Sequence, residues 1–140
     1  YDSLVAYASK GTDIAQLEDS ADDDTTRARP HKIILWGGDD AHPTYEITAR
    51  KFDEYHFEAK NGGYDRADLH DTALSDYVHA NGNSASMYGN NGELDLLYEA
   101  VAFEWVRLYA TDNGSLDTLE KEDPIDFELV YDPLMWEELP

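Results

Sequence analysis

The chain has 140 residues, of which 41% are hydrophobic and 12% aromatic. This apolar content is enough for one folded domain with a modest core, so we do not expect a disordered chain. The formal net charge of -21 disfavours binding to nucleic acids or anionic membranes and favours cations and basic partners. The sequence has no apolar run of transmembrane length, no recognisable signal peptide and no cysteine for disulfides or metal ligation.

The sequence repeats itself with a period of about 51 residues, a feature that takes precedence over local motifs. Three segments open on an aromatic residue followed by an acid: Tyr1-Asp2, Phe52-Asp53 and Phe103-Glu104. We therefore predict a single domain over 1–140, made of repeats 1–51 and 52–102 and a partial repeat 103–140.

The first predicted strand of each repeat is apolar at every second position, which is typical of a β-strand with one buried face. The apolar positions are Leu4, Ala6 and Ala8, then Tyr55, Phe57 and Ala59, then Val106, Leu108 and Ala110. A second alternating line follows at a spacing of 52 residues, bounded by acids at Asp13 and Asp19, at Asp65 and Asp71, and at Asp117 and Asp123.

A third acid precedes another short strand in each repeat, at Asp24, Asp76 and Asp126, and repeats one and two add a strand that ends at Gly37 or Gly89. Turn signals rich in Asn, Asp and Gly separate the strands, at 10–12, 37–40, 61–63, 81–83, 90–92 and 112–114. Short strands with such frequent turns predict an all-β fold.

Two all-β architectures fit this pattern. We expect a repeat architecture of stacked short strands, similar to a β-solenoid, in which Leu4, Tyr55 and Val106 stack inside the wall. The alternative is a compact β-sandwich, in which the repeats supply successive hairpins. The tail 131–140 is interpreted either as a cap, with Leu134, Met135, Trp136 and Leu139 covering an open end, or as a docking segment.

Residues 59–72 and 11–24 resemble repeats of large bacterial secreted and cell-surface proteins. In those repeats a GG-x-D-x-A-x-L-x-D-S-x-x-D-D line alternates with an aromatic-Asp strand and a Tyr-Gly strand, here Tyr88-Gly89. The resemblance implies an extracellular or cell-surface protein that is elongated and all-β, often part of a longer chain. Thr72-Ala-Leu-Ser75 departs from the pattern, because it lacks the acids found at Asp22 and Asp23.

The aspartates are the only feature that suggests chemistry. Calcium takes about 6–8 oxygen ligands, and acids at strand ends beside turns are a natural source of them. The predicted ligands are Asp13, Asp19, Asp22, Asp23, Asp24, Asp65, Asp71 and Asp76. The alternative is that these side chains cap turns and keep the surface hydrated. No EF-hand loop or Gly-rich calcium nonapeptide occurs, so we expect any binding to be weak and coupled to folding.

We do not expect an enzyme. Acids are too frequent to single out a catalytic pair, the five histidines lack metal-ligand spacing, and no nucleophile elbow, phosphate loop or dinucleotide motif occurs. Trp36 and Tyr88 precede glycine at equivalent repeat positions, and we expect them to serve packing.

Trp105 lies on the polar side of its strand with Arg107 and Tyr109, where earlier repeats have Ser3 and Glu54. An aromatic residue gained on an outer face predicts contact with another chain or a ligand, and Trp136 is the second candidate for such a contact. We therefore expect a structural or interaction segment of an assembly or filament, stabilised by calcium, with self-association or a glycan as partner. The alternatives are a carbohydrate-binding module and a salt-adapted acidic domain of another role.

Overall fold

The computed structural model describes residues 2–89, 95–111 and 116–140, and within these ranges it contains β-strands and no helix. The expectation of an all-β fold is confirmed. The predicted turns at 90–92 and 112–114 lie outside the described residues. The strands are β1 (Asp2–Tyr7), β2 (Ile14–Glu18), β3 (Asp24–Arg29), β4 (Lys32–Asp39), β5 (His42–Arg50), β6 (Glu54–Glu58), β7 (Arg66–His70), β8 (Tyr77–Gly82), β9 (Ser84–Gly89), β10 (Asp95–Val101), β11 (Trp105–Tyr109), β12 (Asp117–Ile125), β13 (Glu128–Val130) and β14 (Trp136–Glu138).

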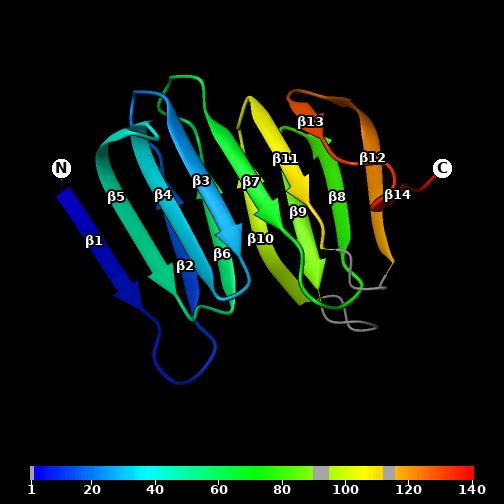
Figure 1. The fold of residues 1–140 in the computed structure, drawn as a ribbon, viewed down its shortest axis with the longest axis horizontal. Coiled ribbons are helices and arrows are strands. Elements are labelled where there is room, and N and C mark those ends of the chain that lie inside the picture. Colours follow the sequence, from blue (N-terminus) through cyan, green and yellow to red (C-terminus); the bar gives the residue numbers. More distant parts are fainter. Residues whose placement is uncertain (1, 90–94, 112–115) are drawn as a thin grey trace.

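The strands form two open seven-stranded sheets that lie one in front of the other, in a sandwich-like arrangement (Figure 1). We call the sheet ordered β1-β5-β4-β3-β7-β11-β13 the first sheet, and the sheet ordered β14-β12-β8-β9-β10-β6-β2 the second sheet. The N-terminal strand β1 and the C-terminal strand β14 lie at opposite ends of the molecule (Figure 1). Among the described residues, no helix is long and apolar enough to cross a membrane.

Equivalent strands of successive repeats lie in opposite sheets. The first strand of each repeat, for example, is in the first sheet as β1, in the second as β6 and in the first again as β11. The expected stack of Leu4, Tyr55 and Val106 is therefore wrong, because Tyr55 lies in the sheet opposite the other two. The reason is topological: each full repeat crosses between the sheets three times, and an odd number of crossings starts the next repeat on the other side.

Two kinds of strand pairing organise the sheets. Within a repeat, β3-β4-β5 and β8-β9-β10 are antiparallel meanders, as short hairpin connections require. Between repeats, β2 pairs with β6, β3 with β7, β7 with β11 and β8 with β12, all in parallel. Consecutive repeats are thus joined by backbone ladders in both sheets.

The core lies between the sheets and follows the predicted alternation except on β1, where Leu4 is exposed. Leu69, Val78 and Leu119 are fully buried on the inner faces. At the C-terminal end, β13 pairs with β11, β14 pairs with β12, and Trp136 is only 2% exposed. Trp36, expected to serve packing, is buried at 8% exposure although it lies on the outer face of β4, where the Arg27 guanidinium covers its ring at 5.3 Å from the centroid.

Candidate metal centres

Two groups of three aspartates lie at equivalent places in successive repeats. In each group, one carboxylate oxygen from every residue lies within 4.8 Å of the other two. We call Asp19, Asp24 and Asp65 the first cluster, and Asp71, Asp76 and Asp117 the second cluster. Each residue of the second cluster stands 52 positions after its counterpart in the first. The repeat therefore builds the same carboxylate arrangement twice.

Parallel pairing of strands explains why the acids meet. Asp24 begins β3 and Asp65 immediately precedes β7, and these strands pair with Thr25 opposite Arg66. The backbone N–H of Asp24 donates to Asp65 Oδ1 at 2.8 Å. In the second cluster, the N–H of Asp76 donates to Asp117 Oδ1 at 2.9 Å, because β8 and β12 pair in the same register. Each cluster thus links the third strand of one repeat to the second strand of the next.

A short loop that changes sheet brings the remaining acid into each cluster. Asp19 follows β2 in the second sheet, and five residues later Asp24 begins β3 in the first sheet. The Asp19 carboxylate accepts hydrogen bonds from the backbone N–H groups of Lys60 and Asn61. Its counterpart Asp71 accepts from the N–H of Thr111 at 2.9 Å. The first acid of each cluster therefore also contacts the following repeat.

A hydroxyl residue and a glycine orient the central acid of each cluster. Ser20 donates to Asp24 through both its backbone N–H and its hydroxyl, each at 2.8 Å from Oδ2. Thr72 does the same for Asp76. Gly37 lies against Asp24, since a Cβ there would be 2.7 Å from Asp24 Oδ1. Gly89, its repeat equivalent, is similarly close to Asp76, at 3.0 Å. The acid and the glycine therefore recur together in both repeats because the carboxylate packs against the glycine.

The clusters differ in one neighbouring side chain. The Tyr45 hydroxyl donates to Asp24 Oδ1 at 2.7 Å, and burial together with this hydrogen bond raises the Tyr45 pKa well above its usual range. The repeat equivalent of Tyr45 is Leu97, which contacts the Gly89 position and offers no hydrogen bond. Asp19 of the first cluster is half-buried as a whole residue, whereas all three aspartates of the second cluster are buried.

Burial makes four of the cluster acids, Asp65, Asp71, Asp76 and Asp117, harder to ionise. It raises the pKa of Asp65 to about 7, and the negative charges of Asp19 and Glu104 add to the rise, against the lowering effect of the Asp24 N–H. Burial likewise raises the pKa of Asp76 and of Asp117 to about 6, and it raises the pKa of Asp71. A nearby cation would reverse these shifts, because it stabilises the ionised form.

One carboxylate oxygen in the first cluster lacks a partner. Asp65 is 1% exposed, and its Oδ2 is buried and accepts no hydrogen bond, although Oδ1 of the same group accepts from Asp24. Leaving a buried carboxylate oxygen unsatisfied costs free energy, so such atoms in folded proteins usually have a ligand or a water. The residues present fit a cation, because ligand atoms on one calcium ion lie at most about 5 Å apart.

The structure brings five of the eight predicted ligands into the clusters: Asp19, Asp24, Asp65, Asp71 and Asp76. The other three lie elsewhere. Asp22 and Asp23 are exposed on the loop before β3, where Asp23 caps the N–H of Tyr64 at 2.7 Å. Asp13 lies at the N-terminal end of β2, away from both clusters. These three lie outside both clusters, and the loop directs Asp22 and Asp23 to solvent.

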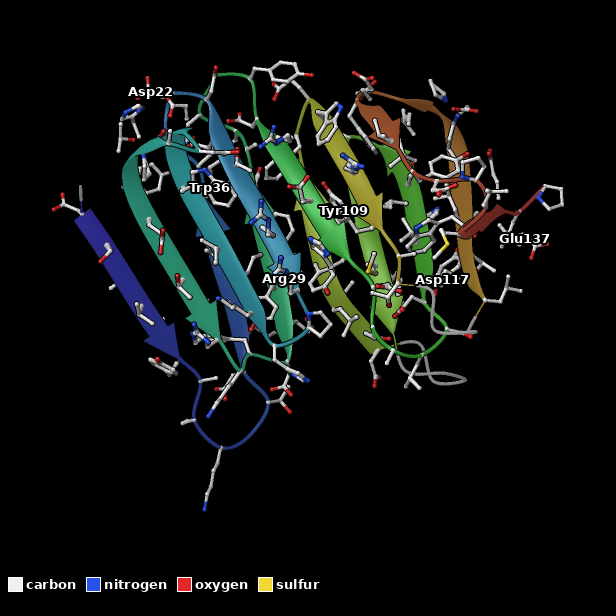
Figure 2. The ribbon with its side chains drawn as sticks, viewed as in Figure 1. Asp22, Arg29, Trp36, Tyr109, Asp117 and Glu137 are labelled. Atoms are coloured by element: carbon white, nitrogen blue, oxygen red, sulfur yellow. The ribbon has the colours of Figure 1, made fainter. Side chains whose placement is uncertain are left out.

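Sequence reasoning missed Asp117 as a member of a cluster, although it stands 52 residues after Asp65 and that spacing was the available signal. Figure 2 shows Asp22, on the loop of the first cluster, and Asp117 at opposite ends of the strands. The clusters occupy opposite ends because the equivalent strands lie in opposite sheets. A third group, His79, Glu120 and Glu122, lies on the more exposed outer face of the second sheet.

The predicted contact residues fall into two sets. Trp105 and Tyr109 are half-buried and Arg107 is exposed on the outer face of the first sheet, where Figure 2 shows Tyr109. Trp136 belongs to the core at 2% exposure, so its prediction as a contact residue is wrong. It is buried because β14 adds to the edge of β12 and turns the indole inward.

Comparison with known proteins adds no identification. No protein-family model, no curated protein and no solved structure is significantly similar to the chain. Function must therefore be argued from the two clusters and the outer faces themselves.

Proposed function

We propose that this chain is a non-catalytic structural segment of an extracellular or cell-surface assembly, and that calcium in the two clusters fastens its consecutive repeats together. One observation carries the proposal. Three aspartates recur in the same relation at a 52-residue shift, and both times they join strands of different repeats. An acid used only to cap a turn needs no acid from a neighbouring repeat beside it.

The ligand chemistry favours calcium among common cations. Both clusters offer only carboxylate oxygens, without the nitrogen or sulfur ligands that zinc and copper prefer. Three carboxylates supply up to six oxygens, and backbone carbonyls or water complete a sphere of about 6–8. Calcium tolerates such irregular geometry, whereas magnesium demands a near-ideal octahedron and retains water. The unpartnered Asp65 Oδ2 is the atom that gains most from the ion.

A cation also relieves the electrostatic cost of the fold. Each cluster places three acids of a chain with net charge -21 together in a poorly hydrated region. Burial and the neighbouring negative charges both oppose the ionisation of Asp65, as its raised pKa indicates. Calcium would replace this repulsion with attraction at a joint between repeats. Its binding free energy would then add to the stability of the folded state.

The finer architecture is part of the proposal. The chain winds between two sheets, and each repeat pairs in parallel with the next. Such a winding can be extended by further repeats without altering the pairing, as in a solenoid. We assign the segment this extendable, solenoid-like role.

Thermal melting of the metal-free protein, with and without calcium up to about 10 mM, tests the proposal. We expect calcium to raise the melting temperature, and Asp65→Asn and Asp117→Asn each to reduce that rise. Asp22→Asn is the matched control, because Asp22 lies on the same loop but outside the cluster. An unchanged midpoint contradicts calcium binding. An equal rise with potassium would instead favour the salt-adapted domain.

A second candidate function is binding of an acidic polysaccharide on the outer face of the first sheet. Four of the ten basic residues, Arg27, Arg29, Arg66 and Arg107, lie on the adjacent strands β3, β7 and β11. Figure 2 shows Arg29, Trp36 and Tyr109 on this face. Arginine is well suited to planar carboxylates, which it binds through two hydrogen bonds.

The aromatic rings on this face do not form a free platform for neutral sugars. The guanidinium of Arg66 lies 5.7 Å from the centroid of Trp105, and that of Arg107 lies 4.6 Å from the centroid of Tyr109. Asp68 is buried among the arginines and offsets one of their charges.

Retention on immobilised polygalacturonate, compared with a neutral glucan, tests this second candidate. We expect Arg107→Ala to weaken retention and Lys10→Ala, on a distant exposed loop, to leave it unchanged. No retention by the intact protein excludes the candidate.

A further inference from the structure

The N-terminal end of the molecule exposes side chains that are buried elsewhere at the same repeat positions. Leu4 on β1 is 59% exposed, whereas its equivalents Tyr55 and Val106 are 2% and 1% exposed. Ala6 on the same strand is half-buried, whereas its equivalents Phe57 and Leu108 are buried. Leu4 therefore faces inward at a place where the second sheet does not cover it.

The equivalent strands show what covers this position in the rest of the molecule. β1 pairs with β5 on one side, as β6 pairs with β10. The other edge of β6 is occupied by β2, and the corresponding edge of β11 is occupied by β7. In both cases the occupant is the second strand of the preceding repeat, paired in parallel. The corresponding edge of β1 has no strand neighbour among the described residues, because β1 ends the first sheet.

The same comparison holds for β2, which ends the second sheet. Its counterparts β7 and β12 pair in parallel with β3 and β8, the third strands of the preceding repeats. A third strand beside β2 would extend the second sheet behind β1, where Figure 1 shows the first sheet overhanging. Both missing neighbours thus belong to one kind of unit.

Asp13 occupies the position at which such a unit would form a further carboxylate cluster. It is the repeat equivalent of Asp65 and Asp117, which accept hydrogen bonds from the first residues of third-strand segments. Its own N–H donates to Asp53 Oδ2 at 2.7 Å, as the N–H of Asp65 donates to Glu104 Oε2 at 2.7 Å. Asp13 Oδ2, however, is buried and without a hydrogen-bond partner.

We propose that the β1–β2 end docks another copy of the 51-residue repeat. The second strand of that copy pairs in parallel with β1, and its third strand pairs with β2 and covers Leu4. Its counterparts of Asp19 and Asp24 complete a third carboxylate cluster with Asp13. The inference rests on the proposed role as a repeat segment, but not on calcium binding.

A second copy of the whole chain does not fit this end. Two β1 edges that meet would extend only the first sheet and leave the inner face at Leu4 uncovered. The C-terminal end of another molecule does not offer the required pair either, because β13 and β14 are its outermost strands, each bound to its own sheet. Only a second and third strand together fill both sheets.

An extended chain tests the proposal. A duplicate of residues 52–102 is placed ahead of Tyr1, so that its last residue, Ala102, meets an aromatic-acid pair as it does at Phe103-Glu104. Hydrogen exchange is measured on the free-edge amides of β1, in the extended chain and in the 140-residue chain. We expect exchange to slow by a factor of about 10 or more in the extended chain, which remains a monomer.

The matched control carries Leu69→Lys and Val78→Lys in the added copy only, which places charges on the inner faces of its second and third strands. We expect this control to leave β1 exchanging as in the 140-residue chain. A further variant, Leu4→Glu, should leave the melting temperature of the 140-residue chain unchanged and lower that of the extended chain.

Three outcomes would overturn the proposal: unchanged exchange at β1, failure of the extended chain to fold while the parent folds, or dimerisation of the parent that protects β1. Measurement both in chelator and in calcium separates this proposal from the preceding one. Docking without a calcium effect refutes only the metal centres, and a calcium effect without docking refutes only the docking.

Discussion

The first and second clusters use the same three positions of the repeat but different surroundings. Asp24 accepts from Ser20 and from the Tyr45 hydroxyl, whereas Asp76 accepts from Thr72 and has Leu97 in the place of the tyrosine. The carboxylates keep their relation because parallel pairing of strands places them there. The backbone register therefore builds the cluster, and neighbouring side chains only adjust its stability.

Removal of the central acid should give the largest difference in stability between the two clusters. We expect Asp24→Ala to lower the free energy of unfolding by about 4 kcal/mol and Asp76→Ala by about 2 kcal/mol, since each buried donor deprived of its partner costs about 1–3 kcal/mol. The difference arises because Tyr45 loses its acceptor only in the first variant. Urea denaturation at fixed salt measures both values, and a larger loss in Asp76→Ala contradicts the ranking.

The glycines beside the clusters provide a second contrast. A Cβ at position 37 would lie 2.4 Å from the Tyr45 ring and 2.7 Å from Asp24, whereas one at position 89 would lie 2.8 Å from the end of Leu97. We expect Gly37→Ala to cost about 3 kcal/mol and Gly89→Ala about 1 kcal/mol, because the leucine side chain moves aside more easily than the ring. Equal losses in urea denaturation would mean that both sites relax alike.

The tyrosine itself can be tested by removing one atom. Tyr45→Phe keeps the ring but removes the hydroxyl that donates to Asp24 Oδ1. We expect a loss of about 2 kcal/mol in the free energy of unfolding, within the range of about 1.5–3 kcal/mol for a hydrogen bond to a charged group. Tyr7→Phe, at an exposed tyrosine on β1, is the matched control and should be neutral. A neutral Tyr45→Phe would show that the two clusters are equivalent in stability.

Much of this fold could be predicted from the alternation of residues. Leu69 and Val78 are buried as their parity indicates, and the repeat boundaries coincide with changes of sheet. The assignment of strands to sheets could not be predicted, because inward and outward residues alternate in the same way in either sheet. That is why the expected stack of Leu4 on Tyr55 failed.

The candidate site was predictable to the same extent. Asp24 and Asp76 recur at the repeat spacing, and so does Asp117, which should have been included on that ground. Asp22 and Asp23 have the same composition and neighbourhood in sequence, yet they face solvent. Composition does not distinguish a loop acid from a cluster acid, because only pairing between strands 41 residues apart brings Asp24 to Asp65.

The smallest expected effect is a dependence of stability on pH. The pKa values of Asp65, Asp76 and Asp117 are raised to about 6–7 in the folded protein, from ordinary values near 4. The folded state therefore binds protons more strongly than the unfolded state. Stability contributed by these groups is fully present below about pH 4 and is lost as the pH rises through about 6–7. The melting temperature of the metal-free protein should fall by a few degrees between about pH 5 and pH 8.

The clusters should differ in this pH dependence, because Asp65 has the highest of the three pKa values. Asp65→Asn should flatten the profile near pH 7, whereas Asp117→Asn should flatten it nearer pH 6, and Asp22→Asn should leave it unchanged. Calcium competes with the protons, so its stabilising effect should be larger at about pH 8 than at pH 5. A melting temperature that rises from pH 5 to pH 8 in chelator would mean that these acids are ionised in the folded protein without a cation. The hydrogen bonds to these carboxylates would then offset the cost of burying them without a cation, as the capping interpretation requires.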